Sequence, residues 1–157
     1  MTVTYHTENP QEVFDFVVGK LFEQGGKSLM DGNNDLICMY RGEGDRRCAL
    51  GWLIPDSEYV PDMEKRVLDA YTGQLSNFDS ATTLSVKSFR VTHNVHLIRA
   101  LQMAHDESPT NHDGSWTEGQ RFDCLIVPQL RRIASSFNLD SSIIDRTFLR
   151  EMSGSQD

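Results

Sequence analysis

The sequence contains little cysteine and no long hydrophobic run. Three cysteines in 157 residues, an odd number, do not suit a disulfide scaffold, so we expect a reducing compartment, the cytoplasm. No apolar stretch approaches the roughly 20 residues that a helix needs to span a bilayer. The first residues, MTVTYHTENP, lack a basic region followed by an apolar one, so we expect no secretory signal. These absences predict a cytoplasmic protein without a membrane partner.

The sequence also lacks the motifs of the common enzyme classes. There is no H-E-x-x-H, no P-loop, no G-x-S-x-G, no dinucleotide fingerprint and no C-x-x-C pair. We therefore expect no cofactor and no metal, and catalysis is the least favoured function. Histidines and aspartates that a metal-dependent hydrolase could use do crowd one region, at His93, His96, His105, Asp106, His112 and Asp113. On a helix, however, His105 falls on the apolar face, away from His93 and His96, which favours a buried structural histidine.

Negative charge is in excess. The formal net charge is −8 and the isoelectric point is about 5.0. Such a surface repels phosphate backbones, so we expect little binding to nucleic acid. An excess of acid groups instead suits docking onto a partner with a basic surface.

Hydrophobic periodicity predicts a single, mainly α domain of four to five helices with one small β-hairpin over residues 1–157, the termini 1–8 and 152–157 being flexible. The first helix has Asn9 as its cap, Pro10 as its first residue and Gly25-Gly26 as its stop. Its apolar face comprises Val13, Phe14, Val17, Val18, Leu21 and Phe22. Further helices are predicted from Pro61 to Tyr71, along HNVHLIRALQMAHDE, from about 118 to 136 with a kink or restart at Pro128, and after Asp140. Residues 72–92 are predicted to form a loop, with at most a short helix.

The stretch CMYRGEGDRRCALGWLIPD, residues 38–56, is the most distinctive. A strand over residues 36–41 and a turn at 42–45 predict a hairpin, although residues 46–52 suit either a return strand or a short helix. In the simplest register Cys38 and Cys48 point to opposite faces, so we expect buried thiols rather than a disulfide or a zinc site. Cys48, which follows Arg46 and Arg47, is the best candidate for a nucleophile. Cys48, Ala49 and Gly51 are small, which predicts that another backbone, such as that of the first helix, passes close by.

This segment resembles a pattern in small uncharacterised proteins of phages and prophages. They carry C-x-Y-R-G, then C-A-x-G-x-L-I-P-D, then Y-x-P-x-M-E, to which CMYRGEGDRRCALGWLIPDSEYVPDMEKRV is similar. LIRALQMAHD is similar to their L-x-x-L-Q-x-x-H-D element. The resemblance implies a phage or mobile-element origin and an accessory role toward the host. It implies no catalytic residue.

A local basic cluster interrupts the acidic sequence. Tyr40, Arg41, Arg46, Arg47 and Trp52 form a candidate site for a small anionic ligand such as a nucleotide. The alternative is that the arginines pair with nearby acids, namely Glu43, Asp45, Asp56 and Glu58.

The C-terminal stretch LRRIASSFNLDSSIIDRTFL has the spacing of a helix-turn-helix. Ala134 would allow a close helix crossing, and Asn138 can adopt the left-handed turn position. A reading helix would present Ser141, Ser142, Arg146 and Arg150 to DNA. Asp145 and the overall acidity oppose this function.

The sequence as a whole favours a phage or prophage accessory protein that binds and modulates a host protein, one that acts in defence or handles nucleic acid. A nucleotide-binding protein and a helix-turn-helix regulator are the alternatives.

Overall fold

The computed structural model describes residues 9–28, 39–64, 66–69, 74–77, 80–85, 94–107 and 126–146. Its helices are α1 (Pro10–Gln24), α2 (Ala49–Leu53), α4 (Val95–Glu107) and α5 (Ile126–Ser136), and residues 142–146 are also helical. Two 3₁₀ helices, η1 (Glu43–Asp45) and η2 (Pro61–Met63), precede the strands β1 (Val67–Leu68), β2 (Gln74–Asn77) and β3 (Ser80–Ser85). The predicted class, a mainly α fold with one small antiparallel β unit, is confirmed.

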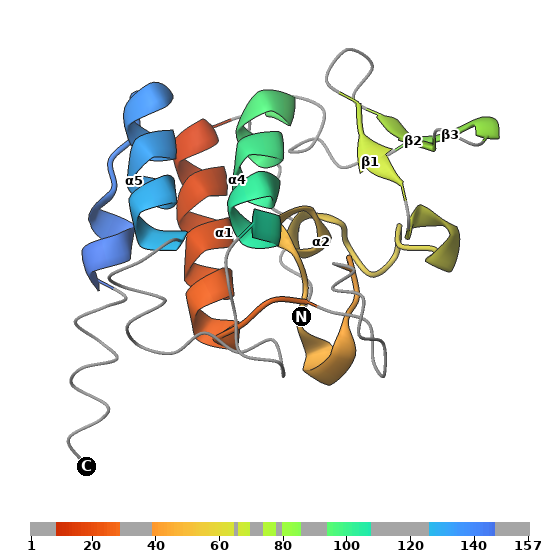
Figure 1. Cartoon of the computed structure of the whole chain (residues 1–157), viewed down its shortest axis with the longest axis horizontal. Helices are drawn as coiled ribbons and strands as arrows, with labels where there is room; N and C mark the ends of the chain where they lie inside the picture. Colours follow the sequence, from red (N-terminus) through yellow and green to blue (C-terminus); the bar gives the residue numbers. More distant parts are fainter. Residues whose placement is uncertain are drawn as a thin grey trace.

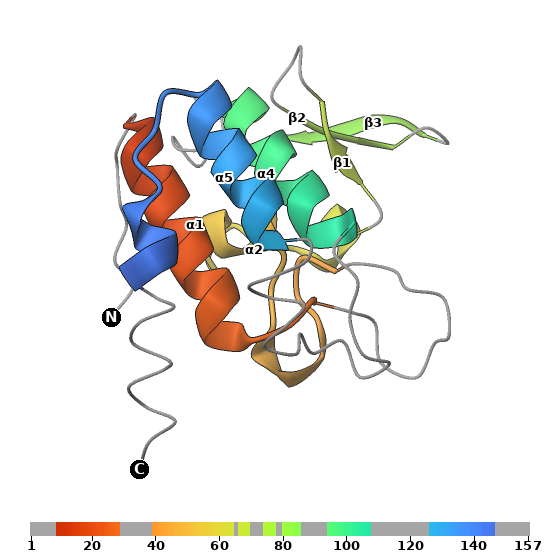
Figure 2. The ribbon, with the colours of Figure 1, turned by 60° about the vertical axis from the view of Figure 1, so that its left-hand side comes forward.

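The three long helices form a bundle, and the sheet lies at one side of it (Figures 1 and 2). Helices α1, α4 and α5 lie side by side, and α2 packs against α1 and α4 (Figure 1). The sheet, in the order β1-β2-β3, lies beyond α4, with β1 the strand nearest that helix (Figures 1 and 2). The core lies between α1, α2, α4 and α5, and the buried strand residues Leu68 and Leu75 belong to the same hydrophobic cluster.

Helix α1 follows the prediction closely. The Asn9 side-chain oxygen accepts a hydrogen bond from the Gln11 backbone N–H at 2.9 Å, and Pro10 is the first helical residue. At the other end Gly25 adopts a left-handed conformation with φ of 71°. All six apolar residues expected on one face, from Val13 to Phe22, are buried.

Helices α4 and α5 are confirmed where the structure describes them. The predicted apolar face of α4 is buried, His105 included. Pro128 is the third residue of α5 as the structure describes it, so the predicted kink or restart concerns the residues before Ile126. Residues 118–125 of the predicted helix lie outside the described part.

The predicted strand over residues 36–41, with its possible return strand after residue 45, is wrong in its described portion. Gly44 and Asp45 both have left-handed backbones, with φ of 69° and 59°, which coil the chain into η1 instead of a two-stranded ladder. The turn itself exists, closed by a hydrogen bond from Gly42 N–H to Arg46 C=O at 2.8 Å. After the turn the chain forms α2 instead of a return strand. Of the two alternatives predicted for residues 46–52, the short helix is therefore confirmed.

The predicted helix from Pro61 to Tyr71 is also wrong. Helical structure ends after η2, because the backbone of Glu64 is extended, with ψ of 149°. Val67 and Leu68 then form β1, with Val67 exposed and Leu68 buried, the alternation of a strand. The loop predicted for 72–92 is wrong where β2 and β3 form an antiparallel pair that places Leu75 opposite Leu84.

Candidate functional site

The Arg41 side chain belongs to the structure of the segment in which it lies. Its guanidinium donates to the C=O groups of Gly51 at 2.6 Å and Ile54 at 2.8 Å, at the C-terminal end of α2. It pairs with Asp56 at 3.1 Å and stacks over the Tyr59 ring at 4.6 Å. Burial, followed by the neighbouring Arg47, lowers the pKa of Arg41. Arg41 thus serves as a cap for α2.

Arg47 and Trp52 are likewise engaged. Arg47 pairs with the same Asp56 oxygen at 3.1 Å and lies 5.0 Å from the Trp52 ring centre, which Lys20 also approaches at 5.3 Å. The Trp52 indole N–H donates to the Gln24 side chain at 3.0 Å. The alternative prediction, pairing of the arginines with nearby acids, is confirmed for Arg41 and Arg47 with Asp56. This pairing reduces the positive charge that the cluster offers to an anion.

Cys48 and Gly51 are structural. The Cys48 side chain is buried, and its sulfur accepts a hydrogen bond from the Gly51 N–H at 3.4 Å. Burial removes the access that a nucleophile needs. A Cβ on Gly51 would overlap the Tyr40 carbonyl oxygen and lie 3.0 Å from the carbonyl carbon. The predicted close backbone is therefore that of Tyr40, not that of α1. Cys38 lies outside the described residues.

The Glu64 carboxylate connects the backbone of Tyr40 and Arg41 to the side chain of Tyr59. Its carboxylate accepts hydrogen bonds from the backbone N–H of Tyr40 at 2.8 Å, the N–H of Arg41 at 3.1 Å and the Tyr59 hydroxyl at 2.9 Å. The Tyr40 hydroxyl donates to the Arg66 C=O, and burial raises the pKa of this phenol far above its usual range. Burial and the bond to Glu64 raise the pKa of Tyr59 to about 12. Both phenols therefore remain neutral donors.

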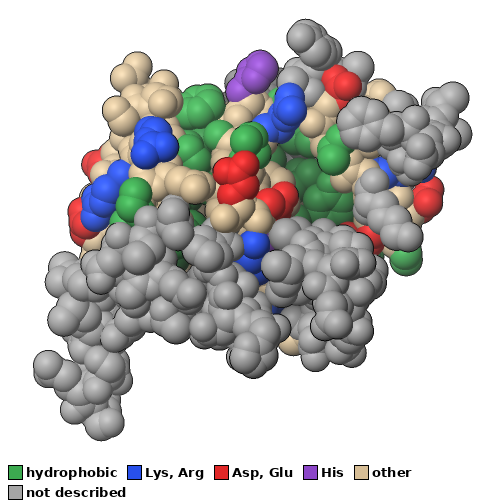
Figure 3. All heavy atoms as spheres, viewed as in Figure 1, with side chains coloured by type: hydrophobic (Ala, Val, Ile, Leu, Met, Phe, Trp, Pro, Cys, Tyr) green, Lys and Arg blue, Asp and Glu red, His purple; other side chains and the backbone are tan. Residues whose placement is uncertain are grey.

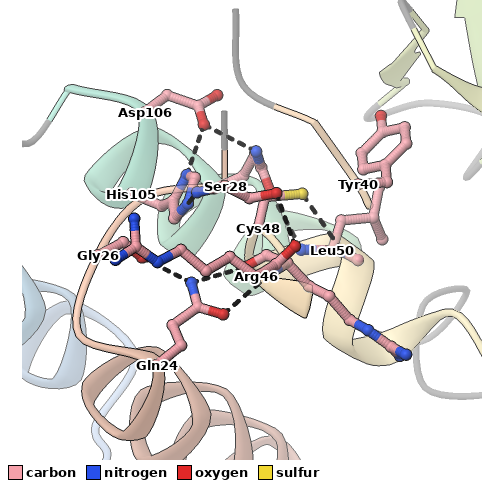
Figure 4. A network of polar contacts seen from close by, with 12 residues as sticks. Gln24, Gly26, Ser28, Tyr40, Arg46, Cys48, Leu50, His105 and Asp106 are labelled. Carbon is pink, nitrogen blue, oxygen red and sulfur yellow. Dashed lines mark hydrogen bonds and ion pairs between the residues drawn. The ribbon is translucent and has the colours of Figure 1, made fainter. Parts of the chain in front are cut away.

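His105 forms a buried polar bridge (Figure 4). Its Nε2 accepts a hydrogen bond from the Ser28 N–H at 3.1 Å, so its Nδ1 carries the proton and donates to Asp106 at 2.9 Å. Gln102 adds to the bridge, because its amide oxygen accepts from the Leu50 N–H at 3.0 Å and its NH₂ donates to Asp106 at 2.9 Å. The prediction of a core histidine bonded to a backbone group or a carboxylate is confirmed by both bonds.

The buried imidazole makes stability depend on pH. Burial first, then Lys27, lowers the pKa of His105 below 6.5, and Asp106 only partly opposes this. The unfolded chain takes up a proton near pH 6.5 and the folded chain does not. Stability is therefore complete above that pH and falls by up to about 1.4 kcal/mol per pH unit below it. Urea unfolding at pH 7.5, 6.5 and 5.5 measures this slope.

Two matched variants isolate the histidine. His105→Gln should reduce the slope between pH 6.5 and 5.5, whereas His96→Gln, at an exposed position on the same helix, should preserve it. Equal slopes in the two variants would contradict the assignment.

A pocket lies between α4 and β1. This cavity of about 330 Å³, here called the α4 pocket, is lined by Tyr40, Glu64, Arg66, Val67, Leu68, Ile98, Arg99, Gln102, Met103 and Asp106. Hydrophobic side chains form its interior, and acidic and basic side chains surround it (Figure 3). Val67 and Met103, at its edge, are 51% and 56% exposed, unusual values for large apolar residues. An apolar cavity with a few polar groups is the usual form of a binding site.

The structure brings only Tyr40 of the predicted ligand site into this pocket. Arg41 and Arg47 lie in the α2 cap, and the Ser28 hydroxyl donates to the Arg46 C=O at 2.9 Å. The sequence reasoning missed the α4 face of the pocket, since Arg99 and Met103 were not singled out. The signal lay in the spacing of Arg99, Gln102, Met103 and Asp106, which places polar and apolar residues on one exposed helix face.

The C-terminal stretch has the turn of a helix-turn-helix. Asn138 adopts the predicted left-handed conformation, with φ of 55°, and Leu139 N–H donates to Ala134 C=O at 2.7 Å. Asp140 accepts from the Ser142 N–H at 2.7 Å, and that bond lowers the pKa of Asp140. Arg131 pairs with Asp145 at 2.6 Å. Ser142 and Arg146 are exposed, and Arg150 lies outside the described residues. The turn at Asn138 agrees with the prediction. Asp145, however, lies on the segment that would contact DNA, and it forms an ion pair with Arg131 of α5.

Comparisons with protein families, curated proteins and solved structures find no match. Among the described residues, no cluster of three or more histidine, cysteine or acidic side chains is arranged to hold a metal ion. His93, His112 and Asp113 lie outside that set. No described helix is long and apolar enough to cross a membrane.

Proposed function

We propose that this chain is a binding protein, an accessory product of a phage or prophage that modulates a host protein through the α4 pocket. One observation carries the proposal. The two segments that resemble phage proteins, about residues 10–70 and 95–106, are separate in the sequence, and together they supply every lining residue of the pocket.

The internal bonding supports binding rather than catalysis. Glu64 receives three hydrogen bonds, and His105 is fully buried between Ser28 and Asp106. A general acid or base must reach a substrate proton, and His105 cannot do so in this position. The exposed apolar pair Val67 and Met103 is instead what a docking surface presents. The net charge of −8 favours a basic partner surface.

Affinity purification tests the proposal. The tagged protein, expressed in the bacterial host, should retain one host protein, and Met103→Glu should reduce its recovery about tenfold or more because a charge enters an apolar pocket. Ser135→Glu adds the same charge at an exposed position on α5 and should leave recovery unchanged. Equal recovery with both variants would contradict the α4 pocket as the site.

A second experiment tests the alternative function, nucleotide binding. A panel of nucleotides at millimolar concentration should leave the melting temperature unchanged, since Asp56 already pairs with Arg41 and Arg47. A nucleotide that raises it by several degrees, and no longer does so in Arg47→Ala, would favour the ligand-binding alternative.

A further inference from the structure

Ser28, shortly after the end of α1, joins three parts of the chain. The residue is fully buried, and each of its polar groups makes a hydrogen bond. Its N–H donates to His105 Nε2 at 3.1 Å, its hydroxyl donates to the Arg46 C=O at 2.9 Å, and its C=O accepts from the Met39 N–H at 2.9 Å. Residues 25–28 are thus bonded to α4 through an acceptor that is a titratable ring (Figure 4).

Protonation of the His105 ring is incompatible with its bond to Ser28. The neutral imidazole accepts from Ser28 through Nε2 and donates to Asp106 through Nδ1 at 2.9 Å. An imidazolium carries a hydrogen atom on both nitrogens, so its Nε2–H would face the Ser28 N–H, donor against donor. The bond to Asp106 suits both forms of the ring. Acid therefore breaks the Ser28 side of the bridge and preserves the Asp106 side.

The charged and titratable groups around the imidazole come from three parts of the described chain. On α4 Asp106 favours the charged ring, and in residues 25–28 the buried Lys27 opposes it. Helix α2, which packs against α4, contributes the Cys48 thiol to the same network (Figure 4). Lys27 lies in the segment that Ser28 holds against α4, so release of this segment lets the two like charges separate. Loss of the hydrogen bond and charge repulsion therefore both favour opening in acid.

The packing of the helices does not depend on the bond to Ser28. Helix α4 contacts α1, α2 and α5, and all four helices contribute buried apolar side chains to one core. In addition, the Leu50 N–H of α2 donates to the Gln102 side chain of α4 at 3.0 Å. Residues 25–28 can thus separate from α4 while these helices remain in contact.

We propose that the hydrogen bond between Ser28 and His105 is an acid-sensitive latch. A proton from the solvent binds Nε2, the bond from the Ser28 N–H breaks, and residues 25–28 detach from α4, while α1, α4 and α5 stay packed together. The protein then has an acid form that is locally open rather than unfolded. The latch goes beyond the proposed function and does not depend on a partner, because all of its groups belong to the described chain.

Native-state hydrogen exchange, measured by NMR in low concentrations of urea, tests the latch. Below pH 6.5 the protection of the Ser28 amide should fall by up to about tenfold per pH unit, through an opening that urea hardly changes. The amide of Val17, on the buried face of α1, should exchange by global unfolding, at a rate that rises steeply with urea. One opening free energy and one urea dependence for both amides would mean that only global unfolding breaks the bond, which would overturn the inference.

His105→Gln is the variant that cannot titrate. Its amide oxygen can accept from Ser28 and its NH₂ can donate to Asp106, so both bonds can form at every pH. Protection of Ser28, corrected for the intrinsic exchange rate, should then be independent of pH, whereas His96→Gln, at an exposed position on α4, should show the wild-type dependence. Wild-type protection of Ser28 that does not change with pH would overturn the inference, and this measurement decides the matter even if His105→Gln does not fold.

Discussion

Gly51→Ala is expected to destabilise the protein by about 3 kcal/mol. The added Cβ would overlap the Tyr40 carbonyl oxygen and lie 3.1 Å from the Tyr40 Cα, and a backbone cannot rotate out of the way as a side chain can. Tyr40 is further fixed by Glu64 and by its own hydroxyl bond to Arg66. Guanidinium unfolding followed by circular dichroism measures the loss.

Gly19→Ala is the matched control. Gly19 lies within α1, and a Cβ there meets nothing within 4 Å. Alanine at this position should stabilise the helix by about 0.5–1 kcal/mol, since glycine loses more backbone entropy on folding. Similar losses of stability in the two variants would mean that the close approach at Gly51 is not rigid.

Glu64→Ala is expected to cost about 3 kcal/mol and to abolish partner binding. The change leaves the amides of Tyr40 and Arg41 and the Tyr59 hydroxyl without their charged acceptor. Hydrogen bonds to charged groups contribute about 1.5–3 kcal/mol each, and three bonds to one carboxylate are not additive. The same unfolding experiment and the host purification give the two readouts.

Glu58→Ala is the control for Glu64→Ala, because it removes a negative charge without removing these hydrogen bonds. This neighbouring acid is partly buried, and the described part of the chain records no hydrogen bond to its side chain. We expect a change within about 0.5 kcal/mol and normal partner recovery. If both variants bind and unfold alike, the carboxylate of Glu64 does not hold the segment together.

The sequence predicts the helices well because their signals are local. The cap at Asn9, the stop at Gly25 and the turn at Asn138 each depend on one residue and its neighbours, and all three are observed. The apolar faces of α1 and α4 follow from a repeat of three to four residues, which determines burial without knowledge of the partner helix.

The strands and the pocket required information from distant residues. Met63, Val67 and Leu68 match a helical spacing, but Glu64 is held extended next to the backbone amides of Tyr40 and Arg41, a contact that local pattern cannot contain. The arginine cluster was read as a ligand site because the sequence does not reveal that Asp56 approaches both Arg41 and Arg47. The pocket forms only where residues 40–68 and 98–106 meet, and the sequence does not show that these two segments are neighbours.

The contact between Gln11 and Asp140 has a consequence for synthesis of the chain. The Gln11 amide donates to the Asp140 C=O at 2.9 Å, and the Asp140 N–H donates back at 2.7 Å, across 129 positions of sequence. The N-terminal end of α1 is thus bonded to a segment that lies 129 positions later in the sequence. The six buried apolar side chains of α1 pack against a core that α2 and α4 help to form, and both helices follow α1 in the chain. A nascent chain stalled before α4 therefore exposes part of this hydrophobic surface to chaperones.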